Sequence, residues 1–109
     1  MAYDEGLAQR VREEMIELPG FVEKKMFGGI GFMLQGNMAC GVNGEDLIVR
    51  VGPERYEDAL ARPHTKPFNM TGRPMKGWVV VSPQGVEADE DLRDWVQQGV
   101  EFASSLPAK

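Results

Sequence analysis

The sequence has very few of the residues from which many active sites and disulfide frameworks are built. Cys40 is its only cysteine and His64 its only histidine. A single cysteine excludes an internal disulfide, and a single histidine excludes a metal site built from several histidines. No apolar run approaches the roughly 20 residues of a membrane span, and the opening stretch MAYDEGLAQR is unlike a secretory signal. We therefore expect a cytoplasmic protein with no membrane association and no cofactor or metal.

Positive charge is also scarce, because the 109 residues carry a net charge of −5. A uniformly acidic surface repels nucleic acid and anionic membranes, so a nucleic-acid partner would need a local basic patch. One stretch differs from the rest: RPHTKPFNMTGRPMK, residues 62–76, has four basic residues and no acidic one. Its candidate partner-binding or anion-binding residues are Arg62, Lys66, Arg73 and Lys76. Two interpretations stay open, a functional surface or a loop whose cations pair with acidic helices.

Length and composition predict one globular domain spanning residues 1–109. Three segments have helical features. The first carries an apolar stripe at helical spacing, Leu7, Val11, Met15 and Leu18, and ends at Pro19-Gly20. The second begins at Gly52-Pro53 and ends at Arg62-Pro63. The third begins near Asp89 and buries Leu92, Trp95, Val96, Gly99 and Ala103, with Leu106 further on.

Between the first two helices the apolar period changes from near four to two, which is typical of strands. The segments IGFMLQ, MACGVN and LIVRV predict an antiparallel meander, and GWVVV a further strand. The fold class is therefore α+β, an antiparallel sheet packed with about three helices. A turn at Gly36-Asn37 would place Phe32 opposite Gly41 and would put Met33 on the core face with Cys40. Both faces of the meander are apolar and need cover, which either the three helices or a partner surface supplies; we predict a homodimer.

The stretch KKMFGGIGFML, residues 24–34, places three glycines within four residues. A phosphate-binding loop needs glycines followed by a helix, but here the glycines precede an alternating, strand-like run. Gly28-Gly29 is therefore better explained as a turn or bulge between strands. Cys40 lies in a predicted strand and is expected to be a buried, unreactive thiol. No nucleophile–base pair is visible, so we expect no catalytic residues and no enzymatic activity.

Several motifs together resemble the N-terminal domain of the TfoX/Sxy family. They are KKMFGGIGFMLQGNMACGV, DLIVRV, KPFNMTGRPMKGWVVV and DLRDWV, and they run from about Glu23 to Val96. The Met26–Gly29 and Gly72–Met75 runs are the most specific. The resemblance implies bacterial origin, an α+β domain without known catalytic residues, and a link to competence and transcription regulation. The family's regulators carry a second, C-terminal domain, which we do not expect here.

Two functions remain open at this level. The first is a non-catalytic regulatory module that interacts with a protein partner, which the family resemblance favours. The alternative is a domain that binds nucleic acid or a small anion through the basic 62–76 stretch, although the net charge gives it no support.

Overall fold

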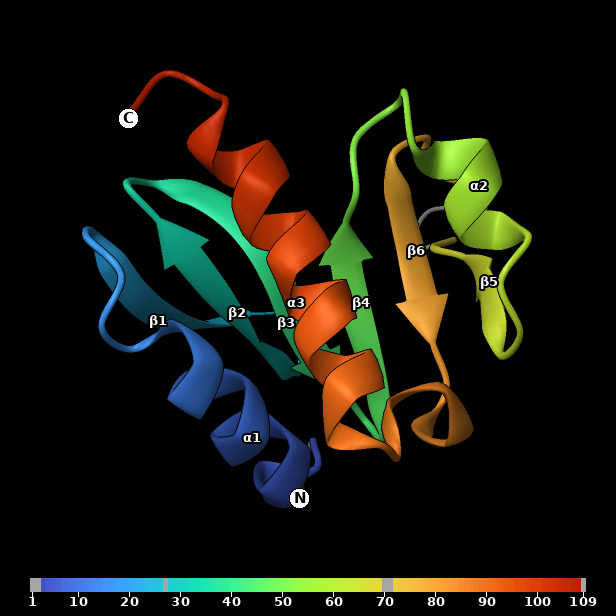
Figure 1. Cartoon of the computed structure of the whole chain (residues 1–109), viewed down its shortest axis with the longest axis horizontal. Helices are drawn as coiled ribbons and strands as arrows, with labels where there is room; N and C mark the ends of the chain where they lie inside the picture. Colours follow the sequence, from blue (N-terminus) through green and yellow to red (C-terminus); the bar gives the residue numbers. More distant parts are fainter. Residues whose placement is uncertain (1–2, 27, 70–71, 109) are drawn as a thin grey trace.

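The six strands of the protein form one antiparallel sheet with the spatial order β1-β2-β3-β4-β6-β5 (Figure 1). The structure is a computed structural model that describes residues 3–26, 28–69 and 72–108. In chain order the elements are α1 (Glu5–Met15), β1 (Phe21–Met26), β2 (Gly29–Leu34), β3 (Asn37–Asn43), β4 (Asp46–Arg50), α2 (Tyr56–Leu60), β5 (Thr65–Pro67), β6 (Trp78–Val81), the 3-10 turn η1 (Pro83–Val86) and α3 (Asp89–Ser104). The predicted α+β class is confirmed.

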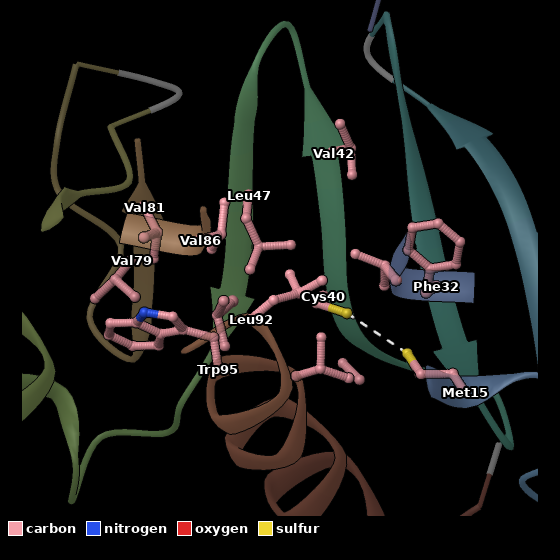
Figure 2. Close-up of a cluster of buried hydrophobic side chains, with 14 of the residues drawn as sticks. Met15, Phe32, Cys40, Val42, Leu47, Val79, Val81, Val86, Leu92 and Trp95 are labelled. Carbon is pink, nitrogen blue, oxygen red and sulfur yellow. Dashed lines mark hydrogen bonds between the residues drawn. The ribbon is translucent and has the colours of Figure 1, made fainter. Parts of the chain in front are cut away.

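The helices contribute to a single core on one face of the sheet, which we call the first face. Figure 1 shows α1 and α3 lying over this face. Val11 of α1, Tyr56 of α2 and Trp95 of α3 belong to the same cluster of buried side chains. Trp95 and Phe32 are the largest side chains in it that are fully buried (Figure 2). The core therefore lies between the helices and the first face, and it leaves the opposite, second face of the sheet to be explained.

Helix α3 crosses the sheet very close to β3, and Gly99 makes this approach possible. A Cβ atom on Gly99 would lie 2.4 Å from the carbonyl oxygen of Ala39, well inside any real contact distance. Leu106, the last residue predicted for the buried face of this helix, lies beyond its end and is half-buried, but the other five predicted residues are buried: Leu92, Trp95, Val96, Gly99 and Ala103. The spacing in the sequence therefore placed this helix correctly on the sheet.

The turn between β2 and β3 lies one residue earlier than predicted. Gln35 and Gly36 have φ angles of 52° and 87°, so they form the two-residue turn, and Leu34 pairs with Asn37. The backbone N–H of Gln35 donates to the carbonyl of Gly20 at 3.0 Å, which stabilises Gln35 in this unusual conformation. The prediction of a Gly36-Asn37 turn was therefore wrong.

The earlier turn alone would keep the predicted faces of β2, because it changes each cross-strand partner by two residues; the faces are reversed by a bulge in the ladder. Phe32 pairs with Cys40 rather than Gly41, and it belongs to the core. Met33 is half-buried and lies outside the core cluster, contrary to the prediction. The bulge lies where the register shifts between Phe32 and Met33, and a slip of one residue moves a side chain to the other side of its partner strand.

Two strands were not predicted from the sequence. β1 and β5 lie at the two edges of the sheet, where neither shows the strong alternation of a half-buried strand. β5 interrupts the 62–76 stretch, so the interpretation of that stretch as one irregular loop was wrong. Pro67 in β5 is typical of an edge strand, since proline has no N–H to give to a further neighbour.

The glycine-rich stretch makes the turn from β1 to β2, as predicted. Met26 pairs with Gly29, and Gly28 has a φ of +79°. A Cβ on Gly29 would lie 2.3 Å from the carbonyl oxygen of Val42, so only glycine fits against β3 here. Phe27, which belongs to the same motif, lies outside the described residues. β2 follows directly, so this turn does not open a helix.

Two polar contacts attach the ends of the chain to the sheet. Arg12 of α1 forms a two-pronged ion pair with Glu23 of β1, in which Nη2 and Oε1 are 2.7 Å apart. The hydrogen bond from Arg12 lowers the pKa of the Glu23 carboxyl. Near the other end, the buried side-chain amide of Asn37 donates to the carbonyl of Pro107 at 2.9 Å. In the described residues, no helix is long and apolar enough to cross a membrane.

Candidate functional site

The second face of the sheet presents apolar side chains that the core does not use. Ile48 and Val80 are only 6% and 7% exposed, yet neither belongs to the core cluster beneath the helices. No residue of a described helix lines the apolar pocket on this face. The segment that follows β5 contributes Phe68 and Met75 to it instead. Ile48 therefore owes its burial to neighbouring strands and to this segment.

One row of paired residues crosses all six strands on the second face. Cross-strand partners share a face, so the register defines the row directly. From β1 to β5 it contains Lys24, Gly31, Gly41, Ile48, Val80 and Lys66. A lysine thus stands on each outer strand, with two glycines and two aliphatic side chains between them. Five strand spacings of about 4.8 Å give the row a length of about 24 Å.

Beside this row lies an apolar cavity of about 260 Å³, which we call the methionine pocket. Six side chains form most of its wall: Met26, Met38, Ile48, Phe68, Met75 and Trp78. Phe68 and Trp78 lie in tilted contact, with ring centroids 6.1 Å apart. Methionine is flexible and polarizable, so a pocket lined by three of them adapts to apolar groups of different shapes.

The two glycines of the row make room for the methionines. A Cβ on Gly41 would lie 2.7 Å from the methyl carbon of Met38, and one on Gly31 would lie 3.0 Å from that of Met26. Both methyl groups therefore lie directly over the backbone of the sheet. Met26 and Met38 are half-buried. This arrangement keeps soft apolar atoms at the surface, where a larger residue at Gly31 or Gly41 would displace them.

A second, wider cavity of about 640 Å³ adjoins the methionine pocket and shares Ile48 and Phe68 with it. Its lining includes Lys66 and Asp46, which carry opposite charges. No ion pair joins them at 4.0 Å or less in the described part of the chain. The apolar pocket is therefore bordered on this side by charged groups that remain available to a ligand.

The four candidate basic residues do not form one cluster. Arg62 forms an ion pair with Asp94 of α3 at 2.6 Å, and its guanidinium lies 4.0 Å from the ring centroid of Trp95. It is thus engaged on the helical side of the molecule. Lys66 projects from β5 beside the wider cavity, and Arg73 and Lys76 are exposed in the segment before β6. Of the four, only Arg62 takes part in an ion pair between described residues.

Cys40 lies in the core, as predicted, and its thiol donates to the sulfur of Met15 at 3.6 Å (Figure 2). Burial raises the pKa of the thiol to about 12, which disfavours the reactive thiolate. His64 is exposed, and its carbonyl accepts the backbone N–H of Ser82. Within the described ranges, no group of three His, Cys, Asp or Glu side chains is arranged to hold a metal ion.

Sequence reasoning missed the methionine pocket, although it noted both its glycines and its apolar strands. The pocket's lining residues come from β1, β2, β3, β4, β6 and the segment after β5; β1 was not predicted, and the register between β2 and β3 was predicted wrongly. One signal was present. Glycines inside strands mark places where a large side chain lies close to the backbone, and Gly31 and Gly41 are such glycines.

Comparison with known proteins adds the family. The family model described as TfoX N-terminal domain matches residues 13–103 of the chain. The match covers all the described strands and most of α3, but only the last turn of α1. No curated protein matches the chain.

Proposed function

The chain belongs to the TfoX N-terminal domain family, and from this premise we propose that it is a non-catalytic regulatory module that binds a protein partner through the second face of its sheet. The family suggests a regulatory or competence-related domain. The observation that carries the proposal is the methionine pocket, an apolar cavity whose lining contains no residue of a described helix. Apolar side chains open to the surface in this way mark interaction sites.

The size of the pocket favours a side chain of a partner over a cofactor. Small-molecule sites usually have volumes of about 300–1,000 Å³, and the methionine pocket has about 260 Å³. Protein interfaces concentrate their binding energy in a few anchor side chains that enter such well-packed pockets. The half-buried Trp78 and Phe68 give the pocket the aromatic wall that is common at these positions.

A second candidate function is the binding of nucleic acid or a small anion. It is favoured by the exposed cations Lys66, Arg73 and Lys76, which have no ion-pair partner in the described part of the chain. Arg62 is not available to it, because that side chain is held by Asp94 and Trp95. A phosphate ligand would also leave the methionine pocket empty. We therefore place this function second.

The test is affinity capture from the native host, followed by mass spectrometry. We expect one protein to be captured by the wild type and lost with the double variant Met26→Gln and Met75→Gln, which makes the pocket polar without adding charge. The matched control is Ile16→Gln, because Ile16 is 56% exposed at the end of α1, away from the pocket. Circular dichroism checks that all three chains fold. Equal capture by the pocket variant would refute the proposal.

A further inference from the structure

Apart from Arg50, whose guanidinium lies over the rings of Trp78 and Phe102, the positive charges of the described residues fall into two groups. Five arginines form ion pairs with carboxylates, and each of these pairs involves a residue of a helix: Arg10, Arg12, Arg55, Arg62 and Arg93. The other group is exposed and has no ion pair in the described ranges: Lys24, Lys25, Lys66, Arg73 and Lys76. The helical side is thus largely neutralised internally, whereas the cations of the outer strands and of the segment before β6 are not.

Lys25 pairs with Ile30 of the core and so belongs to the first face, but other cations of the second group lie on the second face or next to a pocket residue in the sequence. Lys24 and Lys66 stand at the two ends of the row that crosses the sheet. Lys76 follows Met75, which lines the methionine pocket. Among the strand residues of the second face, Asp46 carries a negative charge, which is opposite in sign to these lysines. An apolar centre bordered mainly by free cations is complementary to an apolar group flanked by negative charge.

We infer that the partner's recognition element is an acidic protein segment with one bulky apolar side chain, which enters the methionine pocket while its carboxylates pair with Lys24, Lys66 and Lys76. This inference rests on the proposed function and adds the chemistry of the partner. Charge disfavours the simplest alternative occupant, a second copy of the chain. A second copy stacked symmetrically on this face would bring the lysine-bordered surfaces together, and like charges oppose such an interface.

The inference is tested on the full chain by NMR of methionines labelled with ¹³C in the methyl group. The first probe is a synthetic peptide in which Asp and Glu flank a single leucine. The second probe has Lys in place of each acid, and the third has Ser in place of the leucine. We expect the first peptide alone to shift the methyl signals of Met26, Met38 and Met75. Met15 is the internal control, because it is fully buried in the core on the other face.

Charge variants test quantitatively how much the lysines contribute to binding of the acidic peptide. Lys66→Glu with Lys76→Glu should weaken binding of the acidic peptide about tenfold or more, because introduced like charge is costly at a complementary surface. The control Arg55→Glu changes an exposed cation beside α2, on the helical side, and should leave binding unchanged. Added salt should weaken binding of the acidic peptide in the wild type.

Each contrary result overturns the inference. Equal shifts with the acidic and lysine peptides, or no shift with any peptide, would contradict it. Two further probes are decanoate and duplex DNA. If decanoate but no peptide shifts the methionine methyl signals, the pocket binds a small amphipathic anion. If only duplex DNA shifts them, the face binds nucleic acid. The proposed function fails separately. Capture that is lost with the pocket variant but retained with Lys66→Glu and Lys76→Glu would uphold a protein partner and reject an acidic one.

Discussion

The guanidinium of Arg62 lies over the indole ring of Trp95, with its central carbon 4.0 Å from the ring centroid, while it also pairs with Asp94. This contact joins the end of α2 to α3. Arg62→Ala should lower the free energy of unfolding by about 1 kcal/mol, the usual size of a cation–π contact. Urea denaturation measures it. Arg73→Ala, an exposed cation, is the control and should change stability by less than about 0.5 kcal/mol. Unchanged stability together with lost partner capture would instead assign Arg62 to the binding surface.

The close approach of α3 to β3 gives a prediction in which two effects compete. Alanine is better than glycine inside a helix by about 1 kcal/mol. At Gly99, however, the new Cβ would meet the carbonyl oxygen of Ala39 at 2.4 Å. Helix and sheet must then separate, and overpacking of this kind costs about 1–3 kcal/mol. We expect Gly99→Ala to be destabilised in thermal melts, whereas Gln97→Ala on the exposed side of α3 is not. A stabilised Gly99→Ala would show that α3 has room to move.

Cys40 makes the stability depend on alkaline pH. Its pKa is raised to about 12 in the folded chain, from 9.0, so above pH 9 the unfolded chain loses a proton that the folded chain keeps. Stability therefore falls as pH rises. Between about pH 8 and pH 10 the loss due to this thiol should be about 1.4 kcal/mol. Urea denaturation at both pH values, for the wild type and Cys40→Ala, measures the difference.

The contrary outcome is that the wild type and Cys40→Ala lose the same amount of stability over this pH range. The thiol would then titrate equally in the folded and unfolded states, which would contradict its burial. The same burial predicts slow labelling of Cys40 by thiol reagents in the native protein and fast labelling in denaturant.

Self-association through the second face has a distinctive salt dependence. The homodimer predicted from the sequence would bring Lys24 and Lys66 of one chain close to the same residues of its partner if the faces stack symmetrically. Salt screens this repulsion, so dimer formation should strengthen with added salt. Binding of an acidic partner should weaken with salt. Light scattering over a salt series distinguishes the two, and a dimer that dissociates in salt would contradict stacking by this face.

Helix α3 shows what the sequence could predict. Its five buried positions follow from helical spacing alone, because one stripe of the helix faces the sheet along its whole length. The β1–β2 turn was equally clear, since a strand and not a helix follows Gly29. Both features depend on residues that are near one another in the sequence.

The second face could not be assembled in the same way. The β2–β3 turn was placed one residue late because the carbonyl of Gly20, outside the hairpin, holds Gln35 at positive φ. Local propensity does not include this contact. The pocket also needs Met26 from β1 and Met75 from the segment before β6, which only the order of the strands brings to one face. Arg62 was likewise predicted to act with the other basic residues of 62–76, but a tertiary contact with Trp95 holds it on the helical side.

The hydrogen bond from Asn37 to Pro107 has a practical consequence for anyone who trims or extends the chain. α3 ends at Ser104, which makes that residue the natural place to cut by secondary structure alone. Asn37 is 2% exposed, so a chain cut there would leave its amide without the acceptor that Pro107 provides. An unsatisfied buried donor costs about 1–3 kcal/mol. Expression tags are therefore better joined beyond Pro107, so that the residues after α3 stay bound to the β2–β3 hairpin through Asn37.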